Sequence, residues 1–156
     1  GHEQRVVAQG FAPFVIESLL PRLRAEVGSK PDRASTGIDG GSMGGRLSLL
    51  VGLSHPEVFG AVGAMQPALR VDEAPMVSAL AKAAMTKAKV ALRLVTSTED
   101  YFLAAVKAAS ERMRADAVPH ELLVIPGTHG YEWNRGPGAA EMLLWHERVL
   151  RGLAAP

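Results

Sequence analysis

Apolar residues follow two alternating patterns along the chain, one typical of helices and one typical of buried strands. In residues 14–28 an apolar residue recurs at every fourth position, which predicts a helix that Pro21 bends and Gly28 ends. Beyond it, short apolar runs alternate with helical periods. The runs predict strands at 34–38, 58–65, 89–96 and 120–125, and the periods predict helices at 46–53, 76–88, 101–115 and around 142–150.

This alternation predicts an α/β fold with about four parallel strands in one sheet and helices on both of its faces. In such sheets the ligand crevice lies at the carboxyl ends of the strands. The 156 residues suit one domain, and no repeat or linker divides them, so we expect a single domain over residues 1–156.

Composition narrows the classes of function. Hydrophobic residues make up 47% of the chain and charged residues 21%, which is typical of a folded globular protein. The net charge of +1 and the scattered basic residues argue against nucleic acid as a partner. No apolar run is long enough to cross a membrane, and cysteine is absent, which excludes disulfides and thiolate metal sites. The absence of cysteine does not determine the cellular compartment.

A glycine-rich turn between a predicted strand and a predicted helix contains Ser42. It fails the dinucleotide-binding template, because Asp39 or Ser42 stands where the second glycine is needed. It also fails the phosphate-binding template, because it has no lysine. Gly40, Ser42 and Gly44 fit Gly-x-Ser-x-Gly, which predicts a nucleophile elbow with the Met43 N–H facing the oxyanion.

A serine nucleophile needs a base and an acid, and both candidates follow predicted strands. His129 lies in the loop after strand 120–125, where an imidazole can face a ligand. Structural roles suit His55, His120 and His146, and His2 lies at the end of the chain. Asp100 or Glu99 follows strand 89–96. The order Ser42, Asp100, His129 is the order of serine, acid and histidine in α/β hydrolases.

At these residues the chain resembles the Putative esterase group of the α/β hydrolases, which includes S-formylglutathione hydrolases, feruloyl esterases and enterochelin esterases. The resemblance rests on "GGSMGGRLSLLVGLSHPEVFGAVGAMQPAL", "STED" and "HELLVIPGTHGYEWNR". It implies that Asp100 is the acid and His129 the catalytic histidine. It extends from about residue 14 to residue 150.

The resemblance covers only the carboxyl-terminal half of a complete family member, so it implies a partial α/β-hydrolase fold without the early strands. The loop that supplies the second oxyanion-hole N–H belongs to that earlier part. Strand 34–38 would then have an open edge, and we expect either a missing amino-terminal half or a second copy of the chain to pair with it.

Two positions depart from the family pattern: Asp39 replaces a small apolar residue, and Gly41 replaces a larger one. The Asp39 carboxylate has two open interpretations, a hydrogen bond to a neighbouring loop or repulsion of the oxyanion by like charge. Tyr131 and Trp133 also have two open interpretations: they either line a substrate pocket or pack the His129 loop onto the core.

The sequence therefore predicts a serine hydrolase that cleaves small-molecule carboxylic esters through an acyl-enzyme, with no organic cofactor and no metal ion. Two alternatives remain. An acyltransferase of the same fold would differ only in the second step, in which an alcohol instead of water accepts the acyl group. A catalytically impaired module for binding or assembly is suggested by Asp39 and by the missing oxyanion loop.

Overall fold

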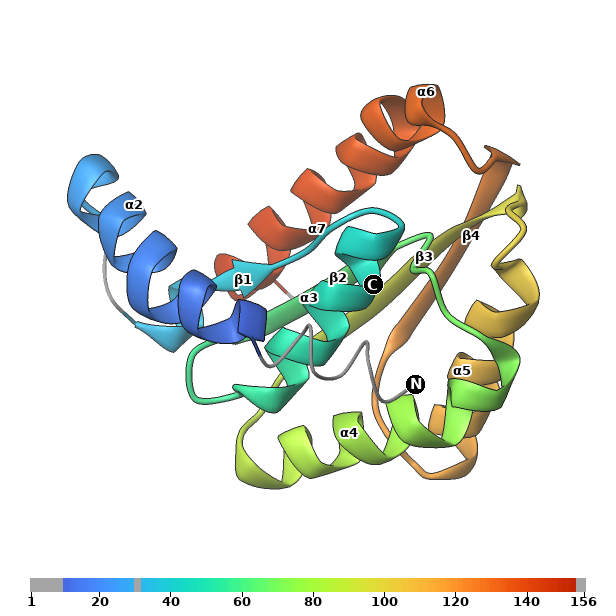
Figure 1. Ribbon diagram of the computed structural model, residues 1–156, viewed down its shortest axis with the longest axis horizontal. Helices are drawn as coiled ribbons and strands as arrows, with labels where there is room; N and C mark the ends of the chain where they lie inside the picture. The colour runs from blue at the N-terminus through green and yellow to red at the C-terminus, as the bar shows by residue number, and fades with distance from the viewer. Residues whose placement is uncertain (1–9, 30–31, 154–156) are drawn as a thin grey trace.

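A single parallel sheet forms the centre of the molecule. The computed structural model describes residues 10–29 and 32–153. Within them four strands pair in the order β1-β2-β3-β4, and every pairing is parallel (Figure 1). The strands are β1 (Gly37–Ile38), β2 (Ala61–Met65), β3 (Ala91–Glu99) and β4 (Glu121–Thr128). The α/β fold with four parallel strands is thus confirmed.

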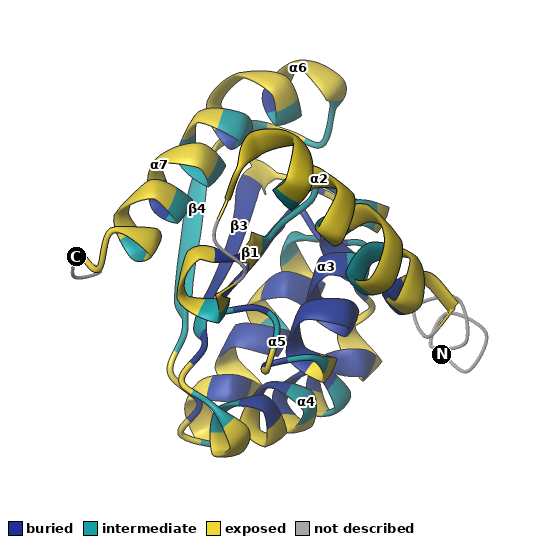
Figure 2. Ribbon diagram, turned by 90° about the vertical axis from the view of Figure 1, so that its left-hand side faces the viewer, coloured by how far each residue is buried: buried dark blue, intermediate teal, exposed yellow. Residues whose placement is uncertain are grey.

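Helices cover both faces of the sheet, as Figures 1 and 2 show from two directions. The helices α3, α4 and α5 lie on one face and α7 on the other. Side chains of β3 alternate between the faces, so that Leu92 and Leu94 join the core under α3 to α5 while Arg93 contacts α7. The helices are α2 (Leu20–Val27), α3 (Met43–Ser54), α4 (Ala74–Lys87), α5 (Leu103–Ala115), α6 (Tyr131–Trp133) and α7 (Ala139–Leu150).

The main core lies between the sheet and the layer of α3, α4 and α5. It is built mainly from aliphatic side chains, together with Phe59 and Met113, and glycine occurs where α3 closely approaches the strands. A Cβ on Gly52 of α3, for example, would lie 2.7 Å from side-chain atoms of Ile38 and Val62. A smaller cluster of Met65, Val95 and Trp133 packs on the other face.

The strand predicted at 34–38 is shorter than expected. Residues Arg33–Ser35 instead form a 3-10 turn (η2) that is capped by Asp32, whose Oδ1 accepts a hydrogen bond from the Ser35 N–H at 2.8 Å. The strand predicted at 58–65 also starts late, at Ala61, while β3 and β4 extend three residues further than predicted.

The prediction of a loop between strand 120–125 and the last helix is wrong for most of the residues concerned. Residues 131–133 form α6, and Asn134–Gly138 form a π-helical turn (η4) that runs into α7. Glycine and proline still interrupt the helix at one point. Gly136 has non-helical angles (φ −94°, ψ −107°) immediately before Pro137. The kink gives the proline ring the room that a straight helix would deny it.

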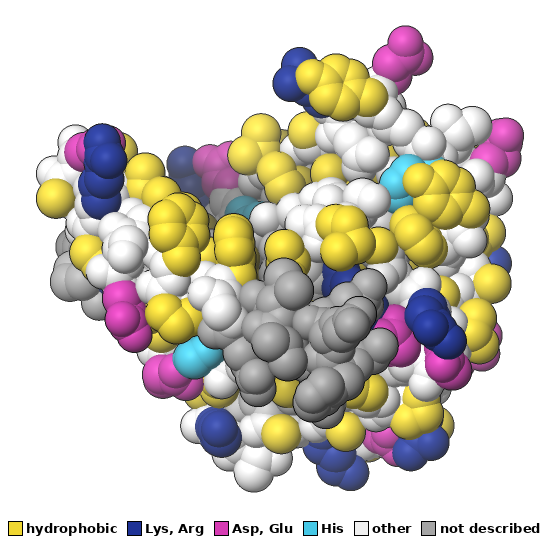
Figure 3. All heavy atoms as spheres, in the orientation of Figure 1, with side chains coloured by type: hydrophobic (Ala, Val, Ile, Leu, Met, Phe, Trp, Pro, Cys, Tyr) yellow, Lys and Arg dark blue, Asp and Glu magenta, His cyan; other side chains and the backbone are white. Residues whose placement is uncertain are grey.

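The helix at residues 10–27 presents an apolar surface to solvent. It contains a π-helical turn, η1 (Phe14–Leu19), directly before α2, which fits the expectation that Pro21 interrupts the regular helical ladder. Figure 3 shows hydrophobic side chains over this helix. Those that are exposed are Phe11, Phe14, Leu19, Leu23 and Val27.

A buried ion pair fixes the first turns of α3. Arg46 is 1% exposed and donates from both terminal nitrogens to the Glu73 carboxylate, at 2.5 and 2.6 Å. Glu73 ends the 3-10 turn η3 (Val71–Glu73) and also accepts from the Arg70 N–H at 2.9 Å. The hydrogen bonds from Arg46 lower the pKa of Glu73 below its ordinary value of 4.5, although burial opposes this shift.

Glu73→Gln is expected to lower the free energy of unfolding at pH 7 by about 3 kcal/mol, because it leaves the Arg46 charge buried without a counter-ion. Since the folded pKa of Glu73 is lowered, its stabilisation is complete above pH 4.5 and is lost as the pH falls through the folded value. The difference between wild type and variant should therefore shrink in acid, which urea denaturation at several pH values would measure.

Asp72→Asn is the matched control, since Asp72 pairs with Arg70 in the same loop but is largely exposed. It should change stability by less than about 1 kcal/mol. If Glu73→Gln had an equally small effect on stability, or one that is independent of pH, Glu73 would not be the stabilising counter-ion of Arg46.

No helix in the described ranges is both long and apolar enough to cross a membrane.

Candidate active site

Ser42 occupies a strained turn between β1 and α3. Its backbone angles, φ 56° and ψ −118°, lie in a region that residues other than glycine rarely adopt. Two backbone hydrogen bonds hold the turn: the Ser42 N–H donates to the Met65 carbonyl at 2.9 Å, and the Ser42 carbonyl accepts from the Ala68 N–H at 3.0 Å. The last residue of β2 and the segment after it therefore hold both the N–H and the carbonyl of Ser42.

Close backbone approach explains two of the glycines around Ser42. A Cβ on Gly40 would lie 2.7 Å from the Gly44 carbonyl carbon, and one on Gly45 would lie 2.7 Å from the Gly40 oxygen. A Cβ on Gly44 would meet nothing within 4 Å. The second glycine of Gly-x-Ser-x-Gly therefore has room for a side chain, and the close backbone contact on that side of Ser42 is made by Gly45, one residue later.

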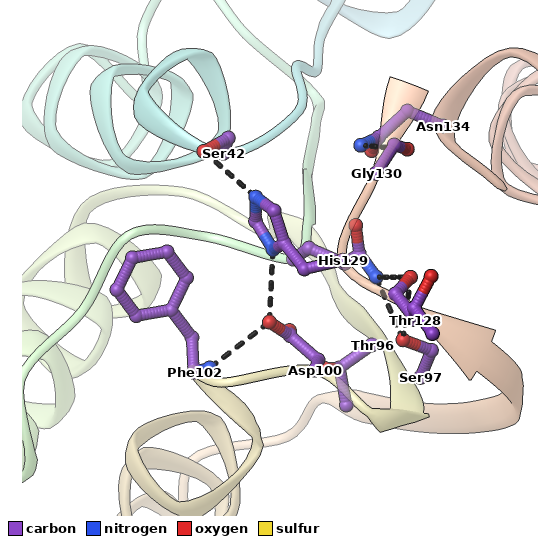
Figure 4. Close-up of polar contacts among 10 residues, drawn as sticks. Ser42, Thr96, Ser97, Asp100, Phe102, Thr128, His129, Gly130 and Asn134 are labelled. Carbon is purple, nitrogen blue, oxygen red and sulfur yellow. Dashed lines mark hydrogen bonds and ion pairs between the residues drawn. The ribbon is translucent and has the colours of Figure 1, made fainter. Parts of the chain in front are cut away.

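His129 lies within hydrogen-bond distance of Ser42, as Figure 4 shows. It follows the last residue of β4, and its Nε2 is 3.1 Å from Ser42 Oγ. Its Nδ1 is 2.8 Å from Asp100 Oδ1. The two ring nitrogens therefore join Ser42 to Asp100, across 87 and 29 residues of sequence respectively.

Asp100 is held by three donors in a buried position at the end of β3. Its Oδ1 accepts from the Phe102 N–H at 2.9 Å as well as facing His129, and its Oδ2 accepts from the Thr96 hydroxyl at 2.6 Å. The side chain is 0% exposed, and that of His129 is 8% exposed. Glu99, the other candidate acid, is exposed. Of the two carboxylates, the structure brings only Asp100 to His129.

Aromatic rings cover the imidazole. The ring centroid of Tyr101 lies 4.1 Å from that of His129 with an angle of 34° between the planes, and Phe102 meets His129 edge-on at 5.3 Å. Sequence analysis missed this contact. The signal was present, since two aromatic residues follow the candidate acid directly, but only the turn after β3 brings them over the histidine.

Met43 is the first residue of α3, where the N–H groups of a helix have no partner within the helix. Its N–H therefore lies next to Ser42 at the positive end of the helix dipole. The Met43 side chain is half-exposed.

Tyr131 and Trp133 differ in their surroundings. Trp133 is 6% exposed, donates from Nε1 to the Pro126 carbonyl at 3.0 Å, and packs against Gly127 and Gly138, so it fastens the His129 loop to the core. Tyr131 is exposed and stacks with the Arg135 guanidinium, 4.1 Å from the ring centroid. A role of Tyr131 in substrate binding stays a prediction.

The Asp39 carboxylate points toward α7. Its Oδ1 accepts from the Gly40 N–H at 2.7 Å, and its Oδ2 is 3.2 Å from Nε2 of His146 on α7. Two glycines make room for the pair: a Cβ on Gly63 would fall within 2 Å of Asp39 Oδ2, and one on Gly37 would lie 2.5 Å from His146 Nδ1. Asp39 therefore has a hydrogen-bond partner, as the first of the two interpretations requires, but that partner lies on a helix rather than in a loop, and His146 is largely buried.

Gly41 also has a local reason. A Cβ at this position would lie 3.1 Å from Asn134 Oδ1 and 3.2 Å from Met65 Cε, so a larger residue would require these two side chains to shift. No group of three or more histidine or acidic side chains suited to a metal ion occurs among the described residues.

A comparison with known protein families identifies the family of this chain. The family model described as Putative esterase matches residues 1–137. The chain belongs to the Putative esterase family. Among curated proteins, none matches it at a significant level. The matched residues of this Putative esterase chain include Ser42, Asp100 and His129.

Solved structures share the fold of this Putative esterase chain. A ferulic acid esterase superposes with a TM-score of 0.74 at 20% identity, covering 88% of this chain and 61% of the other. An S-formylglutathione hydrolase from Staphylococcus aureus gives 0.71 at 14% identity, with 87% and 63% covered. An enterochelin esterase from Shigella flexneri gives 0.70 at 19%, with 90% and 37% covered. The chain thus spans less than two thirds of each of these proteins.

Proposed function

We propose that this chain carries the nucleophile, the base and the acid of a serine hydrolase that cleaves carboxylic esters. The observation that carries the proposal is the continuous set of contacts from Ser42 Oγ to His129 Nε2 and from His129 Nδ1 to Asp100 Oδ1, at 3.1 and 2.8 Å. Membership of the Putative esterase family supports it.

In the first half-reaction Ser42 Oγ attacks the ester carbonyl carbon while His129 Nε2 takes the hydroxyl proton. Asp100 orients the ring through Nδ1 and stabilises the imidazolium that forms. The negative charge on the former carbonyl oxygen is stabilised by the Met43 N–H at the start of α3. When the tetrahedral intermediate collapses, the bond to the alcohol breaks, and His129 returns the proton to the leaving oxygen.

In the second half-reaction water replaces the alcohol. His129 removes a proton from water, the oxygen attacks the acyl carbon, and Ser42 leaves with the proton that His129 returns. An acyltransferase would use an alcohol in place of this water, and product analysis separates the two. The pairing of Asp39 with His146 supports an active site over an impaired one, since the carboxylate has a partner away from Ser42.

Two parts of the proposal extend beyond the described residues. One N–H in place of two would cost about 100- to 1000-fold in turnover, so the proposal includes a second donor from the earlier loop that the family resemblance implies. β1 pairs on one side with β2, and we propose that its other edge pairs with earlier strands or with a second copy of the chain.

A fluorophosphonate probe is expected to label the intact protein at Ser42, because the probe reacts with a serine whose proton can be accepted by a neighbouring base. Mass spectrometry of the digested adduct would locate the label. Ser54→Ala, at the exposed end of the same helix, should label like wild type, and Ser42→Ala should not label. A folded protein that takes up no probe, or takes it up elsewhere, would refute the proposal.

A further inference from the structure

Gln66 is a buried polar residue that sequence analysis did not single out. It directly follows β2, is 0% exposed, and has a backbone φ of 45°, which is unfavourable for a residue other than glycine. Its N–H donates to the Val95 carbonyl at 2.6 Å. A polar side chain held without solvent in a strained backbone requires strong local contacts to persist.

The contacts of its side chain join the carboxyl ends of three strands. Gln66 Nε2 donates to Ser97 Oγ of β3 at 2.7 Å and to the Thr128 carbonyl of β4 at 2.9 Å. The Ser97 hydroxyl in turn donates to the same Thr128 carbonyl, at 3.2 Å. Figure 4 shows Ser97 and Thr128 beside His129. The Thr128 carbonyl therefore accepts two hydrogen bonds from side chains in the interior.

Thr128 is the residue immediately before His129, and its carbonyl lies in the same rigid peptide plane as the His129 N–H. Two donors on that carbonyl consequently fix the plane from which the His129 side chain departs. The same short segment holds the nucleophile, because Met65 and Ala68, on either side of Gln66, bond the N–H and the carbonyl of Ser42. One segment thus contacts both ends of the 3.1 Å distance between Ser42 and His129.

We infer that Gln66 is a positioning residue that sets the place of His129 relative to Ser42 through the Thr128 carbonyl. The inference rests on the proposed roles of Ser42 and His129. Gln66 touches neither the substrate nor the reacting atoms, and its effect is confined to geometry.

Gln66→Met keeps the length of the side chain and removes both N–H donors. It is expected to lower kcat for p-nitrophenyl acetate by about 100-fold with little change in KM, because a small displacement of a catalytic group slows the reaction without weakening binding. The proton resonance of His129 Nδ1–H should shift or broaden in the NMR spectrum. Ser110→Ala is the control, since Ser110 is equally buried but bonds His120; it should change neither readout.

Gln66→Glu decides the case if the methionine variant does not fold. The ionised carboxylate cannot donate to Ser97 or Thr128, whereas the protonated acid regains one donor. The groups that face the Gln66 amide, the Ser97 hydroxyl and the Thr128 carbonyl, carry no charge, and the ionisable groups nearby, Asp100 and His129, are the same in every variant. An additional loss of kcat with rising pH, present in Gln66→Glu alone, is therefore expected.

The inference is overturned if Gln66→Met folds and keeps kcat within about twofold of wild type and leaves the His129 resonance in place, or if Gln66→Glu folds and has the wild-type pH profile. Failure of the proposed function gives a different result: Ser42→Ala, run beside these variants, would retain hydrolysis. The NMR readout does not depend on hydrolysis, so it tests the positioning role separately.

Discussion

Ser42→Ala is expected to lower kcat/KM for p-nitrophenyl acetate by about 10⁴-fold or more in the intact protein. The variant removes the oxygen that would form the acyl-enzyme, while His129 and Asp100 stay paired at 2.8 Å. Direct attack by water is then the only route, helped by the remaining oxyanion donors. The rate of p-nitrophenolate release measures the effect.

Ser54→Ala provides the control in the same helix, because Ser54 is exposed at the end of α3, far along the helix from the elbow. It should hydrolyse at the wild-type rate. Both variants should unfold at temperatures close to that of wild type, since neither changes a core contact. Unchanged hydrolysis by Ser42→Ala would show that another residue is the nucleophile and would refute the serine mechanism.

The sequence was sufficient to place Ser42, Asp100 and His129 together because each follows the end of a strand. In a parallel sheet those ends lie at one edge, so three residues far apart in sequence converge whatever the details of the loops. The strained turn at Ser42 was also predictable, because the Gly40 position and the strand-turn-helix context are local features. Local and topological signals therefore located the candidate site.

Contacts that depend on side-chain packing across the sheet were not predictable in the same way. The Asp39 and His146 side chains pair through gaps left by Gly37 and Gly63, and neither glycine has a positive φ that would mark it as special in a turn. Gln66 stands in an apolar segment, and its partners Ser97 and Thr128 are ordinary strand residues until the register of β2, β3 and β4 aligns their ends.

The two main errors in secondary structure have local physical causes. Glycine and proline at 136–138 predicted a loop, but Trp133 anchors the preceding residues to the core and the kink at Gly136 admits Pro137 to a helix. The strand at 34–38 lost its first residues because Asp32 caps a 3-10 turn there, which competes with pairing to β2.

Asp100→Asn is expected to lower kcat by about 10⁴-fold at neutral pH while leaving the fold intact. In wild type the carboxylate accepts from three donors: His129 Nδ1, the Phe102 N–H and the Thr96 hydroxyl. An asparagine keeps only one carbonyl oxygen. If its NH₂ faces His129, Nδ1 must accept, so the imidazole proton moves to Nε2 and the ring can no longer take the proton of Ser42.

Glu99→Gln is the matched control, because Glu99 is the neighbouring carboxylate but is exposed at the end of β3. It should keep kcat within about twofold of wild type, since an exposed charge is screened by solvent. Steady-state rates between pH 5 and pH 8, about the range in which an unperturbed histidine changes charge, would compare the two variants. The wrong tautomer predicts a loss of kcat in Asp100→Asn with KM nearly unchanged. If Glu99→Gln instead shows the larger loss, Glu99 is the acid and the contact between Asp100 and His129 has only a structural role.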